Sequence, residues 1–68
     1  MDLAKIIAKN IRKYKTVQGT SFLKIAKKAG IPFATLETIL YRSRKDMKLS
    51  TIFKIAKALK VKVDDLLA

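Results

Sequence analysis

Apolar residues recur along this chain at the three- and four-residue spacing of amphipathic helices, and no stretch alternates convincingly as a β-strand does. The first pattern places leucine and isoleucine on one stripe, with lysine and arginine off it. Four shorter patterns follow and are separated by polar or glycine-containing breaks. The spacing predicts five helices, over residues 3–14, 22–29, 33–41, 49–59 and 63–67. We therefore expect an all-α, compact five-helix domain.

The break between the second and third helices is a tight turn. Gly30 stops the second apolar pattern, and Pro32 suits the first turn of a new helix. Ser21 stands where the second helix begins and is a suitable N-cap. Two helices joined by a short turn that contains glycine are typical of a helix-turn-helix, whose second helix can enter the major groove of DNA.

The third predicted helix has an unusual surface. Between Ala29 and Tyr41 the chain has no lysine or arginine, although basic residues flank this stretch on both sides. On a helical wheel the apolar side is formed by Leu36, Ile39 and Leu40. The opposite side and its edges present Phe33, Ala34, Thr35, Glu37, Thr38 and Tyr41. Short polar or apolar side chains can discriminate base edges, whereas lysines bind phosphate regardless of sequence.

Charge points to the same partner. The 68 residues include sixteen lysines and arginines and five acidic residues, a formal net charge of +11. A small domain of this charge is destabilised by self-repulsion unless a polyanion offsets it. A surface made basic only for solubility, or in a thermophile, normally carries abundant glutamate, and Glu37 is the one glutamate here. The composition therefore favours binding to nucleic acid.

Other classes of function have little support. The chain has no histidine or cysteine, so it lacks an imidazole base, a thiolate nucleophile and the usual zinc ligands. We expect no catalytic residue, no metal and no cofactor, and hence no enzyme. No apolar run approaches the roughly 18 to 20 residues that span a bilayer. The length favours a single domain over residues 1–68, and without a signal peptide or disulfide scaffold we expect a cytoplasmic protein with no membrane partner.

Two segments resemble a known family. The stretch IAKKAGIPFATLETIL, followed by KLSTIFKIAKALKVKVDDLL, is similar to the helix-turn-helix domain of the Cro and lambda-repressor-like (XRE) regulators. The second segment follows the family pattern sLetLlkiAkaLgvsldeLL almost throughout. The resemblance covers about Ile7 to Leu67. It implies a five-helix domain that binds operator DNA, usually as a dimer, and regulates transcription, here as a repressor.

The resemblance also implies site residues. Base-reading positions of the family fall on or near Phe33, Ala34, Glu37, Thr38 and Tyr41. Phosphate-binding positions fall on Ser21, Phe22, Arg42, Ser43, Arg44, Lys45 and Lys48. Phe22 stands where the family commonly has a phosphate-binding glutamine. Phe33 and Ala34 replace residues that are commonly polar, so apolar contact with thymine methyl groups and DNA shape is their route to readout. Alternatively, Phe33 folds back onto the core.

A single recognition helix covers about half a turn of major groove, too little for useful specificity in a genome. We therefore expect a homodimer on a palindromic operator, completed on DNA if Lys60 and Lys62 oppose association in free solution. Its interface is expected to include Leu59, Val61, Val63, Leu66 and Leu67. Two other functions remain open: an antitoxin or partner-binding module of a toxin-antitoxin type operon, and a membrane-active cationic peptide.

Overall fold

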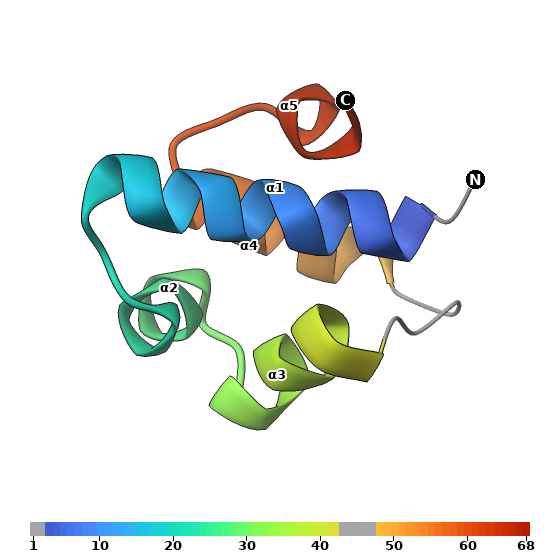
Figure 1. The fold of residues 1–68 in the computed structure, drawn as a ribbon. Helices are drawn as coiled ribbons and strands as arrows, with labels where there is room; N and C mark the ends of the chain where they lie inside the picture. Colours follow the sequence, from blue (N-terminus) through green and yellow to red (C-terminus); the bar gives the residue numbers. More distant parts are fainter. Residues whose placement is uncertain (1–2, 43–47) are drawn as a thin grey trace.

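The computed structural model describes residues 3–42 and 48–68 (Figure 1). These residues form the five predicted helices, and within them no strand occurs. The helices are α1 (Leu3–Gln18), α2 (Phe22–Ala29), α3 (Phe33–Arg42), α4 (Leu49–Ala58) and α5 (Val63–Leu67). The all-α prediction is confirmed. The first helix runs past Tyr14, its last predicted position, to Gln18.

The turn between α2 and α3 has the predicted chemistry. The hydroxyl of Ser21 accepts a hydrogen bond of 3.2 Å from the backbone N–H of Lys24 and so caps the start of α2. Gly30 ends that helix with a φ of 69°, in the left-handed region that glycine adopts without steric cost. The N–H groups of Gly30 and Ile31 then donate to carbonyls of the last turn of α2. These bonds fix the direction in which α3 leaves the turn.

Every helix contributes to one hydrophobic core. The predicted inner side of α3 is buried, since Leu36, Ile39 and Leu40 are each at most 4% exposed. The remaining core side chains are Ile7, Ala8, Ile11, Ile25, Ala26, Ala29, Ile52, Ile55, Ala56, Leu59 and Leu66. Burial of isoleucine and leucine stabilises by about 1.5 to 3 kcal/mol per side chain, which is how so short a chain holds its helices together.

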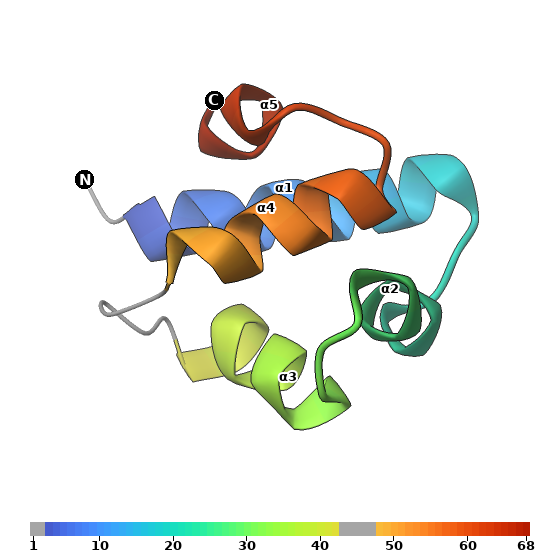
Figure 2. The ribbon, with the colours of Figure 1, turned by 180° about the vertical axis from the view of Figure 1, so that it is seen from behind.

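The helices have a simple arrangement around α1 and α4. In both views, α2 and α3 lie on one side of these two helices and α5 lies on the other (Figures 1 and 2). Helix α2 packs against α3 and α4, while α1 packs against α3 and α5. The helix-turn-helix is therefore supported from behind by two helices, and its outer surface faces away from α5.

Polar side chains of α1 hold the ends of other helices. The buried amide of Asn10 donates to the carbonyl of Leu66 in α5 at 2.9 Å. The amide of Gln18 donates to the carbonyl of Leu59, at the end of α4, at 2.6 Å. Carbonyls at a helix end have no partner within the helix, so these bonds satisfy groups that burial would otherwise leave unpaired. The Asn10 bond fixes α5, which is too short to be stable alone.

Two helices begin without a side-chain cap. Lys48 precedes α4 and Lys62 precedes α5, and neither side chain accepts a hydrogen bond from its helix, because an ammonium group has no acceptor. At α5, Asp65 compensates in part: its carboxylate accepts from the backbone N–H of Lys62 at 2.9 Å. Its position in the first turn also suits the helix dipole.

Candidate nucleic-acid interface

The outer face of α3 carries the predicted base-reading side chains. Ala34, Glu37, Thr38 and Tyr41, which follow one another at helical spacing, line a single shallow hollow. The ring of Tyr41 is well exposed, with 65% of its surface accessible. The structure thus brings together four of the five predicted residues on one uncharged or acidic strip of surface. The predicted division of this helix into an inner and an outer side is confirmed.

Phe33, the fifth predicted residue, lies at the start of α3. Its side chain is 40% exposed, and it is not among the residues that pack against the core. The alternative in which Phe33 folds back as part of the core is therefore not the arrangement found. Its ring remains accessible next to the turn between α2 and α3.

Thr38 has a defined hydrogen-bonding state. Its hydroxyl donates to the backbone carbonyl of Ala34, one turn earlier in α3, at 2.9 Å. The hydroxyl proton is therefore committed within the helix, and the oxygen can still accept a hydrogen bond. Its methyl group and that of Ala34 are short enough to let the helix backbone approach another surface closely.

Arg12 is a residue of this region that sequence patterns did not reveal. It projects from α1, and its Nη2 atom donates to the carbonyl of Leu40 near the end of α3 at 2.7 Å. Its Cζ atom also lies 5.4 Å from the centre of the Tyr41 ring. Both partners lie on a different helix, so no local pattern could have found the contact. A cation near a helix C-terminus offsets the negative end of the dipole.

The start of α2 holds two of the predicted phosphate-binding residues, Ser21 and Phe22. Ser21 is used as the helix cap, as described above. The ring of Phe22 is half-buried and packs against the core, so only its backbone, at the start of α2, is left to meet a phosphate, and that contact stays a prediction. The Nζ atom of Lys15 lies 5.0 Å from the centre of the Phe22 ring. The cation next to the start of α2 is therefore Lys15, a residue that the sequence patterns did not select.

The other predicted phosphate-binding residues lie after α3. Lys48 is exposed and lines a hollow between α3 and α4, together with Thr35, Thr51 and Lys54. Arg42 is the last residue of α3. Ser43, Arg44 and Lys45 lie outside the described residues. The hollow is polar and basic and adjoins the uncapped N-terminus of α4, where the helix dipole favours an anion.

Comparison with protein families matches residues 3–68 to the Cro/C1-type HTH DNA-binding domain. The chain belongs to this family. A hypothetical transcription factor, NHTF, from Neisseria has a similar structure, with 31% sequence identity and a TM-score of 0.88, over 98% of this chain and 76% of that one. The restriction-modification controller protein C.AhdI from Aeromonas hydrophila has the same fold, at 22% identity and a TM-score of 0.81, over 93% and 94% of the two chains. No match was found among curated proteins.

Membership of the Cro/C1-type family confirms the predicted resemblance and gives the general function. The domain is a DNA-binding regulator of transcription, and the family consists of DNA-binding regulators rather than enzymes. Among the described residues, no helix is long and apolar enough to cross a membrane. The same residues contain no group of three or more acidic side chains arranged to hold a metal ion.

The residues predicted for a dimer interface do not all reach the surface of the Cro/C1-type domain. Leu59 and Leu66 are completely buried in the core, so they support the surface from beneath rather than contact a partner. Val61 and Val63 are half-buried, and Leu67 is 36% exposed. The turn after α4 folds α5 back over α1 and so covers these two leucines.

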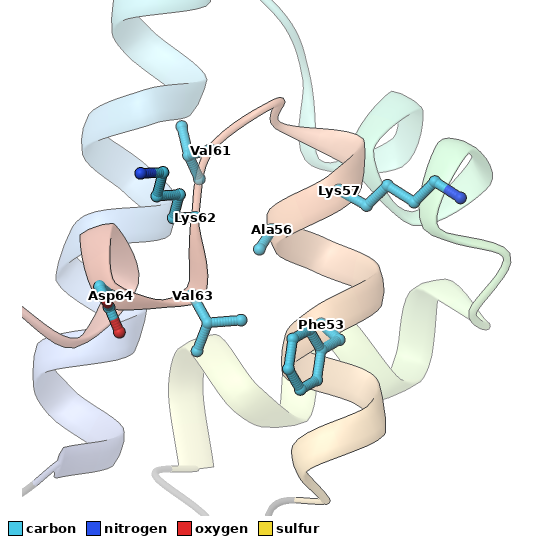
Figure 3. Close-up of a pocket in the computed structure, with 7 residues that line it drawn as sticks. All are labelled: Phe53, Ala56, Lys57, Val61, Lys62, Val63 and Asp64. Carbon is cyan, nitrogen blue, oxygen red and sulfur yellow. The ribbon is translucent and has the colours of Figure 1, made fainter.

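An apolar groove lies next to α5. Val63 extends toward Phe53 of α4, with Ala56 and Val61 along the groove and Lys57 pointing away from it (Figure 3). Phe53 is 57% exposed, so its ring is available in the groove. The groove and the outer face of α3 have no residue in common. Both surfaces can therefore be occupied at once.

Proposed function

We propose that this Cro/C1-type domain is a sequence-specific, double-stranded DNA-binding repressor that places α3 in the major groove. The observation that carries the proposal is the outer face of α3, where side chains that are uncharged or acidic line one surface while cations lie beside it. At about 1.5 Å per residue, this ten-residue helix is about 15 Å long. A helix of this kind fits the major groove, which is about 12 Å wide.

Each residue of the outer face has a distinct chemical use. The Thr38 hydroxyl donates its hydrogen bond to the Ala34 carbonyl, so its oxygen accepts from an exocyclic amino group of adenine or cytosine. Glu37 accepts from the cytosine amino group in the same way. Ala34, Phe33 and the ring of Tyr41 offer apolar contact to thymine methyl groups. The combination favours mixed sequences over runs of guanine, which arginine and lysine read best.

Phosphate contacts come from both ends of the helix-turn-helix. Lys15 supplies a cation beside the capped start of α2, where backbone N–H groups also favour an anion. Lys48, at the start of α4, supplies a second cation. By their position in the sequence, Arg42, Arg44 and Lys45 add further positive charge at this end. These contacts hold the domain on any DNA, and α3 then selects the sequence.

We further propose that two copies bind one palindromic operator as a homodimer. The apolar groove beside α5 is the surface available to the second copy, with Phe53, Val61, Val63 and Leu67 contributing exposed apolar area. Lys57 and Lys62 at its rim repel their counterparts in the second copy. Association in free solution is therefore weak, and DNA, which supplies the counter-charge, completes it.

The experiment that tests this function starts from a library of random DNA duplexes. Sequences retained by the purified domain are enriched over several rounds, and the enriched site is mapped by footprinting. The proposal predicts an enriched palindrome whose half-sites are centred about one helical turn, roughly 34 Å, apart. Enrichment of no sequence, with equal binding to all duplexes, would falsify the proposal.

The dimer is tested on the same enriched site. Val63→Asp places a charge in the groove, and Val17→Asp, at a position 72% exposed near the end of α1, is the matched control. We expect Val63→Asp to abolish cooperative binding to the full site while binding to a single half-site remains. The control should retain cooperativity. If Val63→Asp retains it too, the groove is not the dimer interface, and an acidic partner protein becomes the occupant to test.

A further inference from the structure

Arg12 connects α1 to the DNA-facing end of α3 through two contacts. One is the 2.7 Å hydrogen bond from Nη2 to the carbonyl of Leu40, and the other is the approach of its guanidinium to the Tyr41 ring at 5.4 Å. The partners are consecutive residues at the end of the helix. These two contacts hold the guanidinium beside the ring.

Arginine suits both contacts at once better than lysine does. Its planar guanidinium stacks on an aromatic ring while its N–H groups donate in the same plane, whereas the ammonium of lysine is a compact, strongly hydrated charge. Tyr41 itself is 65% exposed, so few other groups restrain its ring. Without Arg12 the ring gains access to alternative side-chain rotamers, and the last turn of α3 loses a partner for its carbonyl.

We propose that Arg12 is a positioning residue for sequence readout: it holds the Tyr41 ring in the orientation that contacts a base pair at one end of each half-site. The inference rests on the proposed function, because it requires α3 to read bases. Arg12 sets the selectivity at that base pair without contacting the base. The residue that contacts the base is Tyr41.

The test measures base preference at each position of the site enriched from the random library. The variants are Arg12→Lys, Tyr41→Ala and the double variant, and Lys13→Gln is the control, since Lys13 is on α1 but its ring contact is with Tyr14 rather than with α3. Tyr41→Ala should relax preference at one or two base pairs by roughly fivefold or more. Arg12→Lys should relax preference at the same base pairs by about twofold to fivefold, and by no more than Tyr41→Ala does. The double variant should be no more relaxed than Tyr41→Ala, and the control should match wild type.

A spectroscopic measurement checks the contact without DNA. The ring current of Tyr41 should shift the side-chain proton resonances of Arg12 upfield in the free protein, and Tyr41→Ala should remove that shift. Thermal unfolding of each variant shows that it is folded.

Three results overturn the inference. In the first, Arg12→Lys, which keeps the charge, relaxes base preference at positions different from those that Tyr41→Ala affects. In the second, it leaves base preference unchanged at every position. In the third, it weakens binding to all sequences alike, which makes Arg12 a phosphate contact. In each case wild type still selects a site, so the proposed function stands. If wild type itself enriches no site, the proposed function fails, and this inference fails with it.

Discussion

Lys60 occupies a backbone conformation that normally belongs to glycine, and replacing it should stabilise the domain. Its φ is 58°, in the left-handed region, and its N–H and that of Val61 donate to carbonyls of the last turn of α4. This is the same termination that Gly30 provides for α2. A residue with a Cβ atom in this region costs roughly 1 to 2 kcal/mol.

Lys60→Gly removes that cost but adds freedom to the unfolded chain, which opposes stability by roughly 0.4 to 1 kcal/mol. The side chain of Lys60 is exposed, so little packing is lost. The difference is a net stabilisation of about 0.5 to 1 kcal/mol. For a domain of this length, that raises the melting temperature by about 2 to 8 °C.

The assay is urea and thermal unfolding followed by far-UV circular dichroism. Lys60→Ala is the matched control, because it removes the same charge and keeps a Cβ atom at the left-handed position. We expect the glycine variant to be more stable than wild type and the alanine variant not to be. Equal stabilisation by both variants would mean that charge repulsion, rather than the backbone conformation, limits stability at this turn, and the reasoning would be wrong.

Three more changes test separate features. Asn10→Ala leaves the buried carbonyl of Leu66 without its donor and should lower the free energy of unfolding by roughly 1 to 3 kcal/mol in urea titrations; an unchanged value would mean that water replaces the amide. Lys62→Ser supplies the missing cap of α5 and should raise the free energy of unfolding by about 0.5 to 1 kcal/mol, whereas Lys62→Ala, which cannot cap, should not raise it. Lys48→Ala should reduce the slope of log binding constant against log salt by about 0.9 on every DNA sequence, and an unchanged slope would exclude Lys48 from phosphate contact.

Features that depend on neighbours along the chain could be predicted from the sequence. The two sides of α3 follow from the spacing of Leu36, Ile39 and Leu40, because burial of these side chains determines which way the helix faces. The cap at Ser21 and the turn at Gly30 follow from side-chain and backbone chemistry that acts within a few residues. For the same reason the division of the chain into five helices was correct.

Features that depend on packing between helices could not be predicted. Hydrophobic spacing does not distinguish Leu59 and Leu66, which are buried, from Phe53, which is exposed. That difference arises only when α5 folds back over α1. The contact between Lys15 and the Phe22 ring depends in the same way on how α1 and α2 meet, so no local pattern pointed to Lys15.

The central claim is that the outer face of α3 meets base edges in the major groove. The most direct test is nuclear Overhauser spectroscopy of the labelled domain bound to its enriched duplex. We predict contacts from the methyl groups of Ala34 and Thr38 to major-groove protons, such as thymine methyl groups. Contacts to the minor groove, or DNA-induced changes confined to the groove beside α5 with none on α3, would contradict the account.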